Sequence, residues 1–353
     1  MIFNIINNKT EYQKLEKLFY INEQNKVMAD LTMEVTLNSK DIRKKYNEDI
    51  SYFENIKKSF YIDDAFINDF KEYKLENRFN KLNEQSYINN EYFKNIKLND
   101  VKDGIYEFKE ECYEKYESFV YDTISVDKEF RELTNIGYFN NKYNYLTLQE
   151  NGSIWMLISP HEINTMNEAI NKAHGNVITF GLGLGYFAYM TSIKENVISV
   201  TIVERDEKII YLFKKHILPQ FKNKDKIKII NDDALNFIDK KNCDYDYAFI
   251  DLYRDTDDGL PLYIKMYQKA LKHPNCTFDY WIEESMIIMI RRCLIILLYE
   301  VLNKVYDSTL CNTYYDVIIN RLYMILSSYV INDYNDVIKL LSTDNIKELI
   351  KTI

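Results

Sequence analysis

The sequence predicts an α/β protein built around a parallel β-sheet, and three observations support this fold class. Short β-rich segments alternate with helical segments between residues 176 and 283. Three glycines, Gly181, Gly183 and Gly185, follow the first apolar strand and directly precede a helix. The chain has 353 residues, 46% of them hydrophobic, which is enough for a sizeable core and for more than one domain.

The N-terminal part of the chain reads as helical from about residue 10 to residue 130. It contains no proline, and apolar residues recur there at helical spacing in two stretches: Ile42, Tyr46, Ile50, Phe53 and Ile56, then Ile105, Phe108, Cys112, Tyr116 and Phe119. Ser39 is the expected N-cap of the first stretch. We interpret residues 1–135 as a helical N-terminal domain.

Residues 136–175 are predicted to form a β-hairpin and a connecting helix. Two β-rich runs, 143–149 and 154–159, flank the pair Asn151-Gly152, which is a strong hairpin signal. Ser159-Pro160 then opens a short helix over residues 162–174, and Gly175 closes it.

The central segment, residues 176–283, contains five predicted strands. They span residues 177–180, 197–203, 226–230, 245–250 and 276–282. Pro261 is expected to start the helix before the fifth strand. The alternation predicts right-handed crossovers with helices on both faces of the sheet. Residues 284–353 form a helical C-terminal extension, with helices over 286–302, 314–330 and 337–350.

Each of the first four strands ends at residues suited to ligand binding. The glycine turn, Glu204, Asp233 and Asp251 stand at these strand ends, and open parallel sheets bind ligands outside the carboxyl ends of their strands. Glu204 lies 23 positions after Gly181 (204 − 181), which suits an acid that accepts hydrogen bonds from both hydroxyls of a ribose. The alternative for Glu204 is a cap of the following helix.

With these residues in view, residues 155–281 resemble the class I S-adenosylmethionine-dependent methyltransferases, which have a Rossmann-like fold. Gly181-Leu-Gly-Leu-Gly185 matches the glycine motif of that family, Asp233-Ala234 matches the Asp-Ala pair after its third strand, and the segment 247–253 matches its fourth-strand motif. Two features depart from the family pattern. Thr179 stands where an acid is common, and the last two strands are not evident.

The resemblance implies S-adenosylmethionine as cofactor and methyl transfer as the activity. The residues that it places at the cofactor are Gly181, Gly183, Gly185, Glu204, Asp233, Ala234 and Asp251. Asp251 is expected near the reacting centre, where it orients the cofactor amine or receives a proton. Tyr253 is expected either to wall the acceptor pocket or to pack beneath the next helix. Trp155, Ser159, His161 and Trp281 are further candidates for this cleft.

A narrower resemblance is to the spermidine synthase branch, whose members carry a β-hairpin before the same core. The paired aspartates of that branch have the form D-x-x-D, whereas Asp251-Leu-Tyr-Arg-Asp255 has one residue more between the acids. The sequence therefore leaves two alternatives to methyl transfer. They are an aminopropyl transferase and a non-catalytic, nucleoside-binding interaction protein on the same fold.

The composition excludes some function classes. A net charge of −9 argues against nucleic-acid binding and favours a small-molecule acceptor. Five scattered cysteines and four scattered histidines predict neither a disulfide frame nor a metal site and favour a cytoplasmic protein. The N-terminus does not resemble a signal peptide. Arg291 and Arg292 interrupt the apolar run 286–302, which predicts a core helix and not a membrane span. The sequence is compatible with a homo-oligomer.

Overall fold

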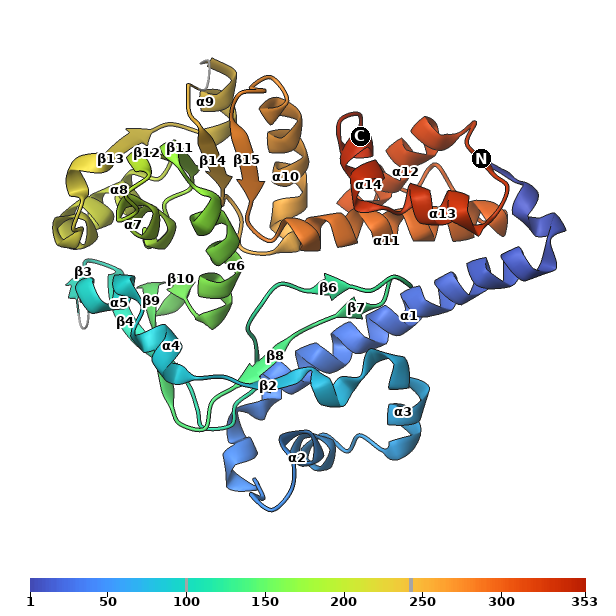
Figure 1. Ribbon diagram of the computed structural model, residues 1–353, viewed down its shortest axis with the longest axis horizontal. Helices are drawn as coiled ribbons and strands as arrows, with labels where there is room; N and C mark the ends of the chain where they lie inside the picture. The colour runs from blue at the N-terminus through green and yellow to red at the C-terminus, as the bar shows by residue number, and fades with distance from the viewer. Residues whose placement is uncertain (99–100, 241–243) are drawn as a thin grey trace.

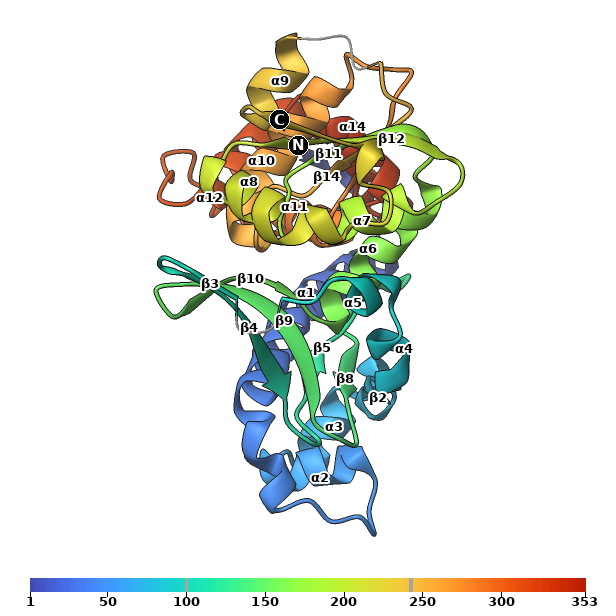
Figure 2. The same ribbon diagram turned by 90° about the vertical axis from the view of Figure 1, so that its left-hand side faces the viewer.

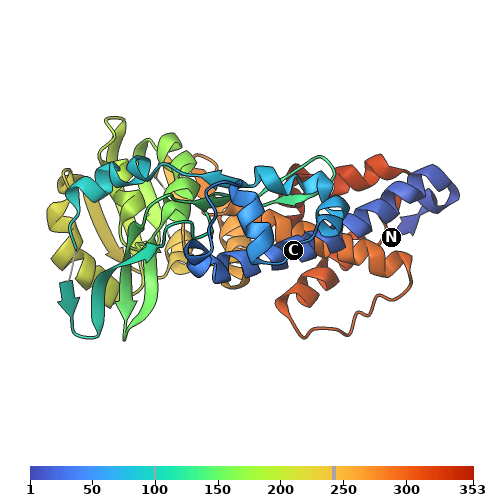
Figure 3. The same ribbon diagram turned by 90° about the horizontal axis from the view of Figure 1, so that it is seen from below.

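The computed structural model describes residues 1–98, 101–240 and 244–353. It contains a central α/β unit, a helical C-terminal unit beside it and an N-terminal unit below both (Figure 1). The long helix α1 (Lys9–Asn38) connects the N-terminal and C-terminal units. It contacts α11 (Glu283–Leu302) and α13 (Tyr334–Leu340) before it continues into the N-terminal unit. Seen from below, the central unit and the C-terminal helices lie at opposite ends of an elongated molecule (Figure 3).

The central unit is a five-stranded parallel sheet with the order β13-β12-β11-β14-β15. The strands are β11 (Gly175–Phe180), β12 (Val197–Glu204), β13 (Ile227–Asn231), β14 (Tyr247–Ile250) and β15 (Thr277–Tyr280). The predicted Rossmann-like, methyltransferase-like core is confirmed. From the central strand β11, the chain adds β12 and β13 on one side of the sheet and then crosses to add β14 and β15 on the other side, so the strand order changes sides between β11 and β14. Within the residues described, the central sheet has no sixth strand.

The helices of the central unit follow the predicted alternation. They are α7 (Tyr186–Ser192), α8 (Glu207–Leu212), α9 (Ala234–Lys240) and α10 (Thr256–Ala270). The start of α10 differs from the prediction, because Pro261 lies inside the helix and Asp255 is its N-cap. Asp255 accepts hydrogen bonds from the amides of Asp257 and Asp258, and the Asp258 side chain accepts one from the Asp255 amide. This capping box sets the helix start earlier than the proline does.

The predicted hairpin is confirmed as β9 (Tyr143–Glu150) and β10 (Ser153–Ile158), which pair antiparallel. Asn151 (φ +51°) and Gly152 (φ +80°) both adopt the left-handed conformation that a two-residue turn of this kind requires. The hairpin is part of a larger sheet with β3 (Val101–Asp103) and β4 (Tyr106–Tyr113), in the order β10-β9-β4-β3. This sheet lies below the central unit (Figure 2), and α6 (Pro160–Lys172) connects the two.

The prediction of a wholly helical N-terminal domain over residues 1–135 is wrong for its second half. The stretch from Ile105 to Phe119 contains strand β4 instead of a helix. Tyr106 and Phe108 are buried on one face of β4, and the strand pairs with β9 along its full length. The apolar spacing fits both periods over so short a stretch, and the distant partner strand decides between them.

The other N-terminal elements are short. Helices are α2 (Tyr52–Ser59), α3 (Asp64–Asp69), α4 (Glu84–Ile88) and α5 (Glu91–Asn95); strands are β2 (Phe79–Lys81), β5 (Phe119–Val120), β6 (Ser125–Val126), β7 (Glu132–Leu133) and β8 (Ile136–Tyr138). Ser39 is not an N-cap, contrary to the prediction. It follows the end of α1, is fully buried, and its hydroxyl accepts a hydrogen bond from the Ser118 amide at 2.7 Å. Its partner lies 79 residues away, beyond the reach of a local pattern.

The C-terminal unit contains the predicted helices as α11 (Glu283–Leu302), α12 (Tyr314–Leu326), α13 (Tyr334–Leu340) and α14 (Thr343–Ile350). Ser342 caps α14 and thereby divides the last predicted helix in two. An unpredicted strand, β16 (Val330–Ile331), pairs in parallel with β1 (Ile2–Phe3). In the part of the chain described, no helix combines the length and the apolar character needed to cross a membrane. Cys243 lies outside the described residues.

Candidate functional site

The glycine turn after β11 uses its three glycines for two different purposes. All three have positive φ, namely +99° at Gly181, +52° at Gly183 and +75° at Gly185. A Cβ on Gly181 would lie 1.8 Å from the carbonyl oxygen of Asp251, and one on Gly185 would lie 2.5 Å from the Phe213 ring. A Cβ on Gly183 would meet nothing within 4 Å. Gly181 and Gly185 therefore allow the turn to pack, whereas Gly183 faces open space that a ligand can enter.

Glu204, the last residue of β12, lies against this turn. One carboxylate oxygen accepts a hydrogen bond from the Leu182 amide at 3.1 Å, and the other accepts one from the Asp206 amide at 2.8 Å. The N-cap of α8 is Asp206, which accepts hydrogen bonds from two amides of the first turn. The alternative role of Glu204 as the helix cap is therefore wrong. Its carboxylate holds the glycine turn, and each oxygen keeps a second lone pair for a ligand.

Asp233 and Ala234 stand where β13 leads into α9. The Asp233 carboxylate accepts a hydrogen bond from the Asn236 amide at 3.0 Å, as a helix N-cap does. Ala234 is buried in the first turn of α9. The Asn231 side chain donates to the backbone carbonyl of Glu204 at 3.1 Å and so ties the ends of β13 and β12 together. Asp233 is thus near the end of its strand, as predicted, with one oxygen committed to the helix.

Asp251 follows β14 and is the most unusual group of this edge. Its amide donates to the Phe180 carbonyl at 2.9 Å, which continues the strand ladder. Within the described residues, its carboxylate has neither a hydrogen bond nor an ion pair, although it lies deep in the protein with only partial access to water. Burial, and then the charges of Glu162 and Glu204, raise the pKa of Asp251 from 3.8 to about 8.

Glu162, in the first turn of α6, is the member of the site that the sequence reasoning missed. Its charge acts on Asp251, so three carboxyl groups from three different elements meet here. A topological signal could have identified it. The chain passes from α6 directly into β11, so a helix that packs on the sheet in this connection begins at the edge where the strand ends.

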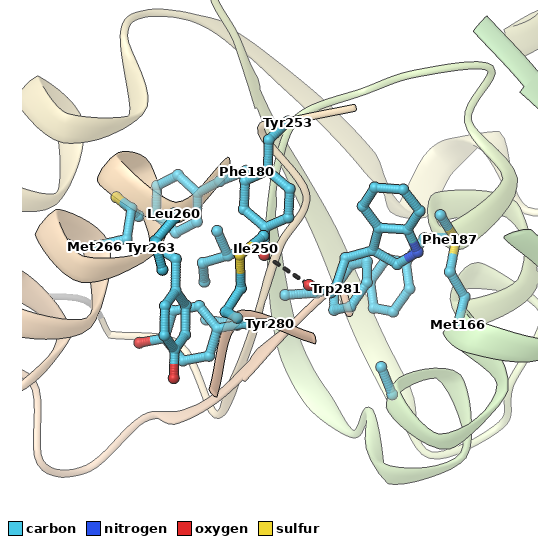
Figure 4. Packing of buried hydrophobic residues seen from close by; sticks show 14 of the residues in the cluster. Met166, Phe180, Phe187, Ile250, Tyr253, Leu260, Tyr263, Met266, Tyr280 and Trp281 are labelled. Carbon is cyan, nitrogen blue, oxygen red and sulfur yellow. Dashed lines mark hydrogen bonds between the residues drawn. The ribbon is translucent and has the colours of Figure 1, made fainter. Parts of the chain in front are cut away.

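Tyr253 and Trp281 pack together beside this edge (Figure 4). Tyr253 is buried, and its hydroxyl donates to the Trp281 backbone carbonyl at 2.6 Å. The two rings lie 6.0 Å apart with an interplanar angle of 28°, and Gly259 of α10 lies against the Tyr253 ring. The packing alternative therefore describes Tyr253. Its expected role at the acceptor pocket or in catalysis stays a prediction, and its hydroxyl is already bonded to a backbone carbonyl.

Of the three candidates on the hairpin side, Trp155, Ser159 and His161, one lies beside the site. Trp155 packs within the hairpin sheet, with its ring 5.8 Å from that of Tyr106. Ser159 is buried. His161 adjoins the site, since its ring meets the edge of the Trp281 ring at 6.2 Å. Only the start of α6 thus joins the strand ends in the way that the sequence indicated.

An open hollow of about 720 Å³ lies on another part of the surface. Its lining residues are Tyr87, Tyr121, Asp122, Asn164, Asn167, Glu168, Asn171 and Lys172. None of them follows a strand of the central sheet, and those from α6 lie beyond its first turn. We therefore place the candidate site at the strand ends, where the glycine turn and the carboxyl groups meet.

Comparisons with known proteins give structural similarities alone. No family model and no curated protein matches the chain. A spermidine synthase from Thermotoga maritima is similar with a TM-score of 0.31 and 12% identity over 48% of this chain and 68% of that one. A spermidine synthase in complex with the transition state analogue AdoDATO gives 0.30 and 13% over 43% and 58%. An SAH-bound methyltransferase from Podospora anserina gives 0.26 and 18% over 32% and 46%.

Proposed function

We propose that the chain binds S-adenosylmethionine at the carboxyl edge of the central sheet and transfers its methyl group to a small acceptor that carries an amine. The observation that carries this proposal is the carboxyl group of Asp251, deep in the site and without a partner among the described residues, with Glu162 and Glu204 nearby. Three carboxyl groups in one place favour positively charged ligands. A sulfonium nucleoside and an ammonium group are both of that kind.

The residues at this edge fit such a cofactor. The open side of Gly183 leaves room for it, and the free lone pairs of Glu204 suit the two hydroxyls of a ribose. We assign the second oxygen of Asp233 and the backbone of Ala234, which follow β13, to the adenine ring. When bound, S-adenosylmethionine supplies a methyl group on a sulfonium sulfur that is a good leaving group.

Asp251 takes the role of proton acceptor in this proposal. An amine arrives at neutral pH as an ammonium ion and must lose a proton before its nitrogen can attack the methyl carbon. The positive charges of the two ligands favour the ionised form of Asp251, which keeps its own proton below about pH 8 in their absence. Once ionised, a carboxylate with a pKa near the working pH accepts the proton of the ammonium group more readily than an ordinary aspartate does. The chain then has only to hold acceptor and methyl group in line and exclude water.

Aminopropyl transfer is the second candidate, and one observation weighs against it. A polyamine site of that branch uses two aspartates after the fourth strand. Here Asp255 serves as the N-cap of α10, where it accepts hydrogen bonds from the amides of Asp257 and Asp258. Asp251 therefore has no second aspartate of that motif beside it, which favours methyl transfer.

Product analysis tests the proposal. The purified chain is incubated with a set of small amines and either S-adenosylmethionine or its decarboxylated form. We expect S-adenosylhomocysteine as the product and a loss of turnover in Asp251→Asn, while the matched variant Asp255→Asn keeps it. Methylthioadenosine would indicate aminopropyl transfer instead. Ligand binding without either product would contradict catalysis and favour a nucleoside-binding protein.

A further inference from the structure

Trp281 lies where two elements of the proposed site meet, and its polar groups engage both of them. Its backbone amide donates to the Ile250 carbonyl at 2.9 Å, and its own carbonyl accepts the Tyr253 hydroxyl at 2.6 Å. Its indole Nε1 donates to the Thr165 hydroxyl of α6 at 2.9 Å. The residue is only 5% exposed. Trp281 is therefore held in one place from two sides.

The partners of Trp281 are neighbours of the acidic groups. Ile250 ends β14 directly before Asp251, and Tyr253 follows Asp251 by two positions in the loop after β14. Thr165 lies three positions after Glu162. Residues three apart in a helix share a face, so the bond to Thr165 fixes the turn of α6 that carries Glu162. Figure 4 shows the indole extending from Tyr253 toward Met166 of α6. The Trp281 side chain thus spans from the Asp251 loop to the Glu162 helix.

The backbone next to Trp281 indicates that this placement is maintained at a cost. Ile282, between Trp281 and the start of α11, has φ +47° and ψ 35°. A β-branched residue rarely adopts this left-handed conformation. The Ile282 carbonyl accepts a hydrogen bond from the Ser285 amide at 3.0 Å, so the chain passes from strand β15 to helix α11 within two residues, Trp281 and Ile282. Strained residues of this kind cluster at functional sites, where the surrounding structure holds them in place.

We infer that Trp281 is a positioning residue, which sets the spacing between Glu162 and Asp251 by tying α6 to the loop after β14. The inference rests on the proposed function, because it assigns a role within that site. It also explains why Tyr253 is bound to the Trp281 carbonyl: the pair forms one rigid wall beside Asp251. Trp281 itself contacts neither the reacting atoms nor the glycine turn in this account.

Burial is the first cause of the raised pKa of Asp251, and the spacing matters because nearby like charges raise that pKa further. The charged groups that act on Asp251 are Glu162 from α6 and Glu204 from β12, and the neutral Tyr253 hydroxyl lies on its own loop. Release of α6 lets Glu162 move away from Asp251. The pKa of Asp251 then falls toward its ordinary value, and Asp251 adds its negative charge to the site at a lower pH.

Calorimetry with two probes measures this effect on the full-length chain. S-adenosylmethionine carries the sulfonium charge and S-adenosylhomocysteine does not, so the ratio of their affinities reports the charge of the site. In the wild type this ratio should increase as the pH rises through about 8, the pKa of Asp251. Thr165→Val removes the acceptor of the indole bond with little change in volume. We expect it to lower the midpoint by roughly half a pH unit, a threefold change in proton affinity.

Trp281→Phe serves as a second variant, because it removes the same bond from the other side and keeps an aromatic ring. Tyr247→Phe is the matched control. It deletes a buried hydroxyl that donates to Asp279 at 2.7 Å, at the amino end of β14 and far from Asp251 along the strand. We expect this control to lower stability without moving the midpoint.

Three outcomes separate the inference from the proposed function. A lowered midpoint in Thr165→Val and Trp281→Phe, with the control unmoved, supports the positioning role. An unchanged midpoint in both variants, with both ligands still bound, overturns the role of Trp281 and leaves the proposed function standing. Failure of the wild type to bind either ligand overturns the proposed function itself.

Discussion

Replacing Asp251 by asparagine should make the ligand-free protein more stable while it abolishes transfer. The carboxyl group is deep in the site and has no partner among the described residues, so the folded state keeps its proton up to a pKa of about 8. The unfolded chain loses that proton above 3.8. Folding therefore takes up a proton between these values, and the stability of the wild type falls as the pH rises from about 4 to about 8. Asparagine has no such proton to lose.

The pKa difference sets the size of the effect. At pH 7 about three pH units separate the solution from the unfolded pKa, which gives an upper limit of about 4 kcal/mol at about 1.4 kcal/mol per unit. Partial access of Asp251 to water lowers this figure, so we expect Asp251→Asn to gain about 2–4 kcal/mol at pH 7. At pH 5.5 the gain should be about half as large, and it should stay constant above pH 8.

Urea unfolding of both proteins at pH 5.5, 7 and 8.5 measures the gap directly. Asp69→Asn is the control, since Asp69 is exposed and its replacement should change stability by less than about 0.5 kcal/mol at every pH. If the difference in unfolding free energy between Asp251→Asn and the wild type is the same at all three pH values, the pKa of Asp251 is not raised in the folded chain. A gain in stability over the wild type that is smaller at pH 8.5 than at pH 5.5 would also contradict a raised pKa of Asp251.

Three further predictions concern the glycine turn, Glu204 and the ion pair of Glu132. Gly183→Ala should cost only about 1 kcal/mol of stability, seen as a lower melting temperature, but should weaken the affinity for S-adenosylmethionine at least tenfold by calorimetry. Gly181→Ala should cost several times more stability, because its Cβ collides with the backbone. Glu204→Ala should weaken the ligand about ten- to a hundredfold, and Asp206→Ala should instead cost about 1 kcal/mol of stability with affinity unchanged. Glu132→Gln, which removes the buried carboxylate that pairs with the half-buried Arg292 of α11, should cost about 2–4 kcal/mol in urea unfolding.

The central unit could be predicted because its signals are local. The run 197–203 is β-branched and apolar, and it is buried in the structure from Val200 to Val203. The glycine turn and the acids at the strand ends follow from the same pattern, since the direction of each strand fixes the edge where its last residue lies. The hairpin could also be predicted from the sequence, because Asn151-Gly152 needs no distant partner to form its turn.

The misses share a cause, which is that a distant segment decides the local structure. Strand β4 depends on β9, and Ser39 is buried against Ser118. Glu162 joins the site only because α6 begins at the edge where β11 ends, so its distance from Asp251 is a property of the topology. The hydrogen-bond partner of Tyr253 could not be predicted for a similar reason, since it lies 28 residues further along the chain.

Titration calorimetry of the purified chain with S-adenosylmethionine, after removal of any ligand carried through purification, tests the central claim most directly. We expect one molecule bound per chain, and an affinity at least tenfold weaker in Gly183→Ala. We also expect the affinity to increase between pH 7 and 8.5, as Asp251 ionises. The absence of binding heat with both S-adenosylmethionine and S-adenosylhomocysteine, together with binding of a nicotinamide dinucleotide, would contradict this claim.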